Sequence, residues 1–508
     1  MVGVVDLLLG IDIGTGSTKG LLVDPSGAVV ASEAVSHSMQ LPRTGWAEMD
    51  AEAMWWREVC AISRVLSAQV PAGSAVAALC VSGVGPCLVL CDEALRPLRP
   101  AILYGVDTRA SAEIELLTKE LGADAILERA GTVLSSQAVG PKLEWVRRHE
   151  PEVFERATRW YGSNSYIAAK LTGEYVMDHH TASQCDPLYA TREFDWNTEW
   201  AQRICEHLQL PRLVWPSDVV GTVHETAAVA TGLRVGTPVV AGTVDAYAEA
   251  FSVGVRQPGD RMLMYGSTMF LVQIIDTYFS DPALWTTAGV ERETLALAAG
   301  TSTAGSLVRW LQTVTGGAPL QTLMAEAQAV PPGSEGLVVL PYLAGERTPV
   351  FDPDARGVFA GLTLRHGRGH LFRAVYEGIS FGIRQILERF DDAHVATRTV
   401  AVGGGLRSPV WAQTLTDVTG RPQLVPEQVI GASYGDALLA AIGVGLVPSD
   451  TDWAKIAAEI APDPANRALY DDLYRTWCDL YPATRDLVHR LAAVDTNGDR
   501  ESRRPHRD

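Results

Sequence analysis

A glycine- and hydroxyl-rich turn between two apolar runs restricts the fold of this chain more than any other feature. The apolar run 7–13 enters the turn Gly14-Thr15-Gly16-Ser17, and a second apolar run, 18–23, leaves it. The segment 24–27 predicts another turn, followed by a third strand over 28–35. Because strand follows strand with no helix between them, we expect a β-β-β start to an α/β domain.

This pattern excludes two common phosphate-binding motifs. A dinucleotide fingerprint needs a third glycine and a helix where this chain has Lys19 and a strand. A P-loop needs a lysine directly after a glycine, and no lysine of the chain has that neighbour. An ordinary hairpin turn stays open as an alternative, since Gly and Thr are common in turns.

The first turn has the groups that bind a phosphate. Its glycines let backbone N–H groups approach an anion, and the hydroxyls of Thr15, Ser17 and Thr18 add donors. Lys19 adds a positive charge. Asp12 would repel a phosphate directly but can hold Mg²⁺ through water. We therefore expect this turn, from Asp12 through Gly14 to Lys19, to bind the Mg²⁺ complex of a nucleotide.

Two glycine segments in the second half fit the same interpretation. Gly266-Ser267-Thr268 lies between two apolar runs, where a second phosphate-binding turn is expected. Gly403-Gly404-Gly405 follows the predicted strand 398–402, and Ser408 before Pro409 predicts a capped helix. Either segment alone is more often a plain turn. Together with the first turn, in similar positions in the two halves, they predict a duplicated domain that binds one nucleotide.

The length of 508 residues is too great for one core and indicates two domains. We place the boundary so that 1–244 form an N-terminal domain and 245–492 a C-terminal domain. The polar, charged segment 493–508 predicts a disordered tail.

The net charge of −18 argues against nucleic acid or an anionic membrane as a partner. The seven cysteines have no C-x-x-C spacing, which is typical of free thiols in a reducing compartment. The sequence offers no basic n-region and no long apolar run, so we expect a cytoplasmic protein.

An ordered series of motifs over about residues 5 to 485 resembles the FGGY carbohydrate kinases, which share a superfamily with actin and heat-shock chaperones. The matching segments are Asp12-x-Gly14-Thr15-x-Ser17-x-Lys19, Gly45-Trp46-Ala47-Glu48-x-Asp50, Asp107-x-Arg109, Pro141-Lys142-Leu143-x-Trp145, 171–174, 340–349, 352–357, Gly403-Gly404-Gly405 with Ser408, and 431–439. The series is most similar to the xylulokinase branch.

The resemblance implies two actin-like (ribonuclease H-like) α/β domains around a central cleft. It implies transfer of the γ-phosphate of ATP to a hydroxyl of a small sugar, with Asp245 as general base that also touches the substrate. It places Val84, Gly85, Pro86 and Asp107 at the sugar. It also allows a homodimer, although no segment identifies an interface.

The expected sugar pocket departs from the xylulokinase pattern at three places. Val84-Gly85-Pro86 stands where many of those enzymes have Met-His-Gly, Gly105 where they often have Trp, and Ala246 where they often have Asn. D-xylulose is therefore the leading candidate, and other ketoses, pentitols and aldonic acids such as gluconate stay open.

Two further questions stay open from the sequence. Asp107 fits either a sugar contact or an ion pair with Arg109. The chain also fits a nucleotide-gated regulator or a plain nucleotide hydrolase on the same fold, although the presence of both Asp12 and Asp245 favours the kinase.

Overall fold

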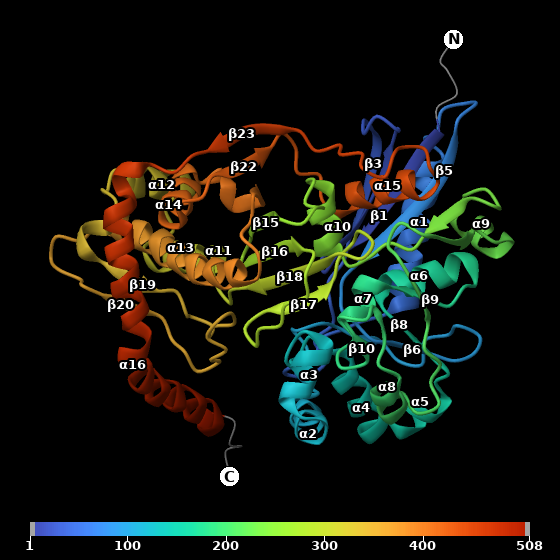
Figure 1. Cartoon of the computed structure of the whole chain (residues 1–508), viewed down its shortest axis with the longest axis horizontal. Helices are drawn as coiled ribbons and strands as arrows, with labels where there is room; N and C mark the ends of the chain where they lie inside the picture. Colours follow the sequence, from blue (N-terminus) through green and yellow to red (C-terminus); the bar gives the residue numbers. More distant parts are fainter. Residues whose placement is uncertain (1–5, 503–508) are drawn as a thin grey trace. The chain divides into compact units, whose positions relative to one another are not determined.

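The computed structural model describes residues 6–502, and side chains through residue 494. Contacts within the chain divide it into two compact units. Unit 1 holds the described residues up to Pro258 together with 274–296 and 428–455. Unit 2 holds 259–273, 297–427 and the described residues from 456 onwards. Figure 1 traces the chain, which passes between the units several times.

This division differs from the single boundary predicted at 244/245. Helix α10 (Asp245–Ser252), which starts at that boundary, belongs to unit 1, and so does α15 (Ala432–Gly443) from late in the sequence. The two helices pack against each other, and α15 also packs on the first strand. Contacts between distant parts of the sequence decide the grouping, so no single cut through the chain reproduces it.

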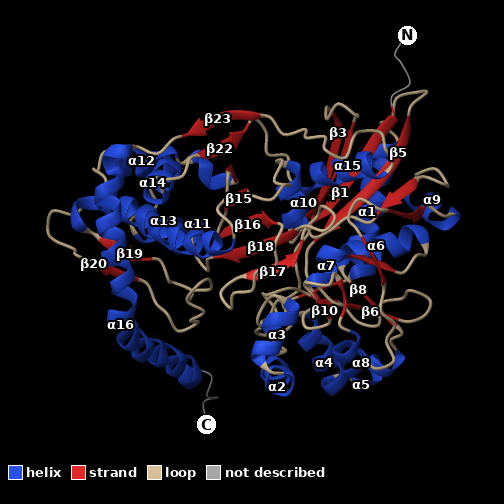
Figure 2. Ribbon diagram, in the orientation of Figure 1, coloured by secondary structure: helices blue, strands red, loops and turns tan. Residues whose placement is uncertain are grey.

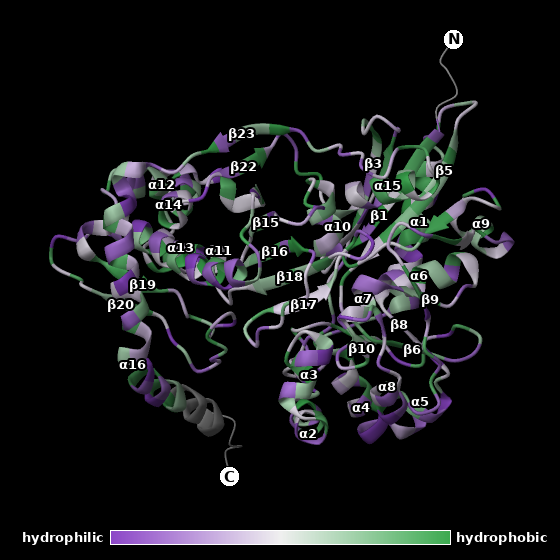
Figure 3. Ribbon diagram, viewed as in Figure 1, coloured by the Kyte–Doolittle hydropathy of each residue, from purple (hydrophilic) through white to green (hydrophobic). Residues whose placement is uncertain are grey.

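Unit 1 is built on a six-stranded sheet in the order β13-β14-β5-β1-β2-β3. Its strands are β1 (Asp6–Ile13), β2 (Ser17–Val23), β3 (Val29–Ser36), β5 (Ala75–Gly83), β13 (Val219–Thr222) and β14 (Pro238–Val240). Strand β2 is antiparallel to both β1 and β3, whereas β5 is parallel to β1 and β14. The predicted β-β-β start is confirmed. Every residue of β1 after Asp6 is buried, and Figure 3 shows the hydrophobic character of β1 and β5.

Helices cover both faces of this sheet (Figure 2). Gly10 and Ile11 are neighbours on β1 and so face opposite sides, and Gly20 pairs with Ile11. A Cβ at Gly20 would lie 2.4 Å from Ile62 of α1 (Arg57–Ser67), and one at Gly10 would lie 1.9 Å from the Ser433 carbonyl of α15. Glycine therefore allows α1 to approach one face of the sheet and α15 the other.

The other elements of unit 1 surround this sheet or form a region of short strands and helices. The remaining helices are η1 (Ala51–Trp56), α2 (Ser111–Leu121), α3 (Ala123–Ala130), α4 (Val139–His149), α5 (Pro151–Arg156), α6 (Ser163–Thr172), α7 (His179–Ser183), α8 (Thr198–Cys205) and α9 (Glu225–Thr231). The paired short strands are β4 (Glu48–Met49) with β7 (Ala101–Ile102), β6 (Val89–Cys91) with β8 (Arg159–Tyr161), β9 (Val176–Asp178) with β12 (Arg212–Val214), and β10 (Tyr189–Ala190) with β11 (Asp195–Trp196).

Unit 2 is built on a sheet in the order β17-β18-β16-β15-β21-β22-β23, of which β17 and the ends of β16 and β18 are grouped with unit 1. The strands are β15 (Asp260–Tyr265), β16 (Met269–Ile275), β17 (Trp285–Ala288), β18 (Leu295–Gly300), β21 (Arg398–Val402), β22 (Gln423–Pro426) and β23 (Ile456–Ile460), with β19 (Val338–Leu340) and β20 (Val358–Ala360) as a separate pair. The helices are α11 (Gly305–Val314), α12 (Leu320–Gln328), η2 (Ser334–Gly336), α13 (Arg368–Ala393), η3 (Gly404–Arg407), α14 (Pro409–Thr419), η4 (Pro464–Asn466) and α16 (Arg467–Ser502).

Two local predictions in unit 2 can be compared with these helices. The Ser408 side chain accepts a hydrogen bond from the Trp411 N–H, as the sequence predicts. Helix α14 ends at Gly420, which has the left-handed conformation. The structure differs from the predicted disordered tail over 493–508, because α16 continues to Ser502. Val488 and Ala492, on the part of the helix just before that segment, are buried. Residues 503–508 lie outside the described residues.

Candidate active site

Asp12 lies in a row of three side chains that share one face of the unit 1 sheet. It is directly opposite Lys19 on β2 and Ser82 on β5. Paired positions point to the same face, and Gly10, two residues before Asp12, faces α15. The row therefore lies on the α15 side. Asp12 is buried, whereas Lys19 is exposed.

Helix α15 adds a carboxyl group to this row. The Ser82 hydroxyl donates a hydrogen bond of 2.6 Å to Asp436, which is completely buried. Burial raises the pKa of Asp436 well above its ordinary value. The sequence analysis did not single out Asp436, although an aspartate in a helix otherwise rich in Ala and Leu was a usable signal. We interpret the Ser82–Asp436 bond as the anchor of α15 on the sheet.

Helix α10 adds two more carboxylates beside the row. Asp245 is its first residue, and Glu249 follows one turn later, so both lie on one side of the helix. Val244, just before α10, forms a bridge with Gly83 at the end of β5, which brings Asp245 next to the 83–86 segment. Sequence reasoning identified Asp245 but missed Glu249, whose signal was its spacing of four residues from Asp245.

The carboxyl groups influence one another's protonation. Burial raises the pKa of Asp12 to about 7, with a further increase from Glu249 and an opposing effect of Lys19. Burial, and then the negative charges of Asp12 and Glu249, raise the pKa of Asp245 well above its ordinary value. Burial also raises the pKa of Glu249, and Lys19 opposes it. Each negative charge disfavours ionisation of the other carboxyl groups, and a nearby cation favours it.

The geometry fits a hydrated divalent cation near Asp12 better than a directly chelated one. The Oδ1 atom of Asp12 is buried and has no hydrogen-bond partner among the described residues, which leaves it ready to accept from a bound water. Among those same residues, no group of three or more His, Cys, Asp and Glu side chains has the spacing to hold a metal. The water-mediated contact of Asp12 with Mg²⁺ stays a prediction.

The predicted phosphate turn of unit 1 is closed by its own backbone. The Gly14 N–H donates to the Ser17 carbonyl at 3.0 Å, and the His37 ring bonds the Gly14 carbonyl at 2.9 Å. A Cβ at Gly16 would meet nothing within 4 Å, so this side of the turn is open. Thr18 differs from the prediction, because its buried hydroxyl donates to Glu58 of α1 on the opposite face from Lys19.

The two glycine segments of unit 2 lie at the same end of neighbouring strands. β15 and β21 are parallel partners, with Met264 opposite Val402, so the turns that follow them are adjacent. Gly403 has a φ of 98°, and a Cβ there would lie 2.6 Å from the Tyr265 carbonyl. Only glycine fits such a position. The structure thus brings the segments 266–268 and 403–405 together.

Three predicted residues in unit 2 have local bonds. The Gly266 N–H donates to the Thr268 carbonyl at 3.0 Å, and the Ser267 hydroxyl accepts from Arg309 of α11. Arg309 therefore brings a positive charge to the 266–268 turn. The sequence analysis predicted the turn but did not identify Arg309. The Ser408 hydroxyl caps α14 by accepting from the Trp411 N–H, and its contact with the nucleotide stays a prediction.

The segment Val84-Gly85-Pro86 lies beside the start of α10. The Val84 N–H donates to the Ile13 carbonyl at 2.7 Å, and its own carbonyl accepts from Ser163 at 2.7 Å. A Cβ at Gly85 would lie 2.8 Å from Val244. The segment thus supplies a close-packed, largely apolar wall next to Asp245, as expected for a position that has lost polar side chains.

Asp107 lies inside a closed ion-pair network. Its carboxylate accepts from the Ala47 N–H at 2.7 Å and from Arg109 at 2.7 Å, and its side chain is 0% exposed. Arg109 also bonds Glu48 at 2.7 Å and stacks on Trp46 at 3.9 Å. Of the two interpretations that the sequence left open, this geometry favours the structural ion pair.

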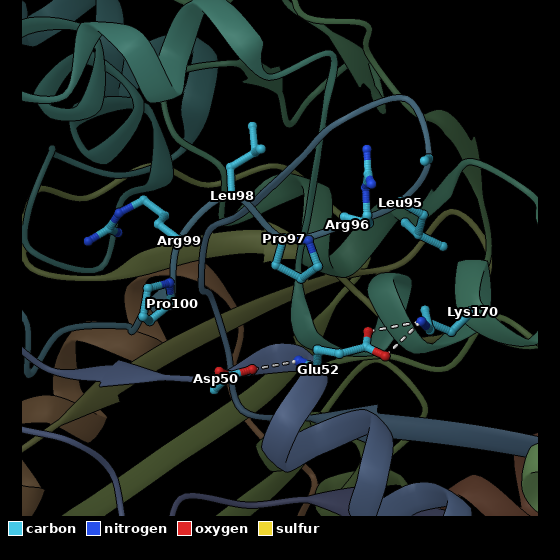
Figure 4. Close-up of a pocket in the computed structure, with 10 residues that line it drawn as sticks. Asp50, Glu52, Leu95, Arg96, Pro97, Leu98, Arg99, Pro100 and Lys170 are labelled. Atoms are coloured by element: carbon cyan, nitrogen blue, oxygen red, sulfur yellow. Dashed lines mark hydrogen bonds and ion pairs between the residues drawn. The ribbon is translucent and has the colours of Figure 1, made fainter.

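A separate polar pocket of unit 1, shown in Figure 4, contains none of the predicted site residues. Its volume is about 540 Å³, and it is lined by Asp50, Glu52, Lys170 and the segment 94–100. Lys170 bonds Glu52 at 2.9 Å, and Asp50 caps η1. Because these polar groups already have partners, we assign no ligand to this pocket.

The two α/β units and the family models that they match define an actin-like phosphotransferase that acts on a sugar hydroxyl. The chain belongs to the FGGY family of carbohydrate kinases. Residues 7–252 match the N-terminal domain of that family, and residues 262–444 match its C-terminal domain. No helix within 6–502 combines the length and hydrophobicity needed to cross a membrane.

Individual relatives include enzymes named for two different sugars. The chain is 32% identical to the xylulose kinase of Escherichia coli (strain K12), over 86% of this chain and 89% of that protein. It is 29% identical to a gluconokinase of Bacillus subtilis (strain 168), over 87% of this chain and 88% of that one. The crystal structure of xylulose kinase from Rhodospirillum rubrum superposes with a TM-score of 0.89, at 33% identity and over 95% of this chain and 100% of that chain.

Proposed function

We propose that the protein phosphorylates D-xylulose with Mg·ATP, using Asp245 as the general base. The observation that carries the proposal is the position of Asp245. It lies at the start of α10 and beside the end of β5, next to the row formed by Asp12, Lys19 and Ser82. The names of several relatives favour D-xylulose as the acceptor. Gluconate is the second candidate, because gluconokinases are also among the relatives.

In this proposal each group of the site has one task. Asp245 accepts the proton of the sugar hydroxyl as that oxygen attacks the γ-phosphate, and its raised pKa makes it a stronger base near neutral pH. Lys19 and the N–H groups of the first turn bind phosphate oxygens. Asp12 would hold the hydration shell of Mg²⁺, and the bound ion would supply positive charge to the phosphate oxygens. The glycine segments of unit 2 contact the nucleotide through their backbone.

The test is a coupled assay of ADP release with Mg·ATP and a panel of acceptors. The panel holds D-xylulose, D-ribulose, L-ribulose, L-xylulose, glycerol, pentitols and gluconate. We expect the highest kcat/KM with D-xylulose. A higher value with gluconate would move the proposal to the second candidate. If no acceptor raises ADP release above the background rate, the kinase proposal fails in favour of a nucleotide-gated regulator or a plain hydrolase.

A further inference from the structure

The carboxamide of Gln137 occupies the space beside Gly105, the position where many xylulokinases have Trp. The Gly105 N–H donates to Oε1 of Gln137 at 3.0 Å. A Cβ at Gly105 would lie 2.9 Å from Cδ and 3.0 Å from Nε2 of the same side chain. The absence of a side chain at Gly105 is therefore what lets the amide lie there.

The backbone at Gln137 is held from the opposite side by a buried lysine. Nζ of Lys142 donates to the carbonyls of Ser136, Gln137 and Ala138 at 2.6, 3.2 and 3.3 Å. Lys142 is only 1% exposed, and the Ser136 hydroxyl donates to the Gly105 carbonyl at 2.9 Å. The amide is thus fixed through both its side chain and its backbone. Such preorganisation lowers the entropy that a binding group loses when a ligand arrives.

One end of this fixed amide has no partner. Nε2 of Gln137 has no hydrogen bond to any of the described residues, and the side chain is half-buried. The Tyr104 hydroxyl, one residue before Gly105, lies 3.3 Å from the Thr15 hydroxyl of the phosphate turn. The N–H₂ group of Gln137 therefore lies beside Gly105, whose neighbour Tyr104 contacts the turn expected to bind the transferred phosphate.

We propose that Nε2 of Gln137 donates a hydrogen bond to a hydroxyl or carbonyl oxygen of the acceptor sugar and so helps to select it. This inference rests on the proposed kinase function. In place of an aromatic surface, the Gly105–Gln137 pair offers the sugar a polar donor. A site with a fixed donor discriminates against acceptors that cannot accept from it, because the donor would be left without a partner.

Gln137→Glu separates this role from a merely structural one. A glutamate keeps an oxygen that accepts from the Gly105 N–H but has no N–H₂ group. We expect the KM for the best acceptor to rise by about 10-fold or more, while the KM for ATP stays within about twofold. Gly105→Ala should give the same pattern, because the new Cβ displaces the amide. Gln69→Leu, at an exposed position just after α1, is the control. It should change neither the KM for the acceptor nor the KM for ATP.

The outcomes separate this inference from the proposed function. An active wild-type enzyme whose acceptor KM is unchanged in both Gln137→Glu and Gly105→Ala would overturn the role of Gln137 alone. A wild-type enzyme that phosphorylates no acceptor would overturn both proposals. Melting temperatures identify a variant that fails to fold, and the other variant then decides. A rise in acceptor KM with an unchanged ATP KM supports the proposal.

Discussion

Asp12 and Lys19 lie directly opposite each other in the antiparallel ladder of β1 and β2. Their side chains share one face of the sheet. Burial raises the pKa of Asp12, and the positive charge of Lys19 partly offsets that increase. Lys19 also opposes the raised pKa of Glu249 on α10. A single exposed lysine therefore balances at least two carboxyl groups of the proposed site, and this balance makes the site sensitive to pH and to single substitutions.

The first prediction concerns Lys19→Met. Loss of the positive charge removes a phosphate contact, so we expect the KM for ATP to rise by about 10-fold or more. The pKa of Asp12 should also rise, because the cation that favours its ionised form is gone. The acid limb of the pH profile then moves to higher pH. Steady-state kinetics between pH 5.5 and 9 measure both effects, and an unchanged ATP KM would remove Lys19 from the phosphate site.

The second prediction concerns pH in the wild type. The pKa values of Asp12 and Asp245 are raised, with that of Asp12 at about 7, so protonation occurs at higher pH than for ordinary carboxyl groups. The kcat/KM for ATP depends on ionised carboxylates in the free enzyme and should therefore fall as pH decreases through about 7. A profile that is flat down to pH 5 would contradict this account.

Glu249→Gln provides a directional check of the same idea. Glu249 raises the pKa values of Asp12 and Asp245 through its negative charge. Its neutral replacement should lower both, so that the acid limb moves to lower pH, opposite to the shift expected for Lys19→Met. The pH profiles of the two variants, recorded under identical conditions, test this. Shifts in the same direction would show that the charges do not act as described.

The third prediction concerns the packing of α15 on β1. Gly10→Ala places a Cβ 1.9 Å from the Ser433 carbonyl, which forces the helix away from the sheet. We expect a loss of about 1–3 kcal/mol in the free energy of unfolding. Gly382→Ala is the matched control. Gly382 lies in the middle of α13, and its new Cβ would be 4.0 Å from the nearest atoms of the Trp477 ring, which is an ordinary contact distance. That change should stabilise the protein by about 0.5–1 kcal/mol. Chemical denaturation of both variants measures the difference, and equal stability would contradict the close approach.

The sequence predicted those parts of the fold that local patterns determine. The strands β1, β2 and β3, the pair β15 and β16, and the capped helix α14 follow from apolar runs and turn residues, and the structure confirms them. The grouping of α10 and α15 with β1 depends on contacts between residues hundreds of positions apart. No local pattern carries that information.

The residues of the candidate site also fall into two groups, those that a local sequence pattern identifies and those that only the folded chain brings together. Asp12 and Lys19 could be selected because they flank a recognisable turn, and Asp245 could be selected because a family motif surrounds it. Glu249 and Gln137 have no such motif, and Asp436 lies in the matching segment 431–439, where nothing marks it as part of the site. The environment of all three arises only when α10, α15 and the loop before α4 reach the sheet region. Thr18 was selected for its place in the turn, but strand alternation directs its side chain to the opposite face.

The most direct test of the central claim is the turnover of Asp245→Asn. Asparagine keeps the size of the side chain but cannot accept the proton of a sugar hydroxyl. The account predicts that kcat with the best acceptor falls by on the order of 10²–10⁴, while the dissociation constant for ATP stays within about twofold. Asp472→Asn, at an exposed surface position, serves as the control and should behave like the wild type. A kcat close to that of the wild type in Asp245→Asn would contradict the assignment of Asp245 as the general base.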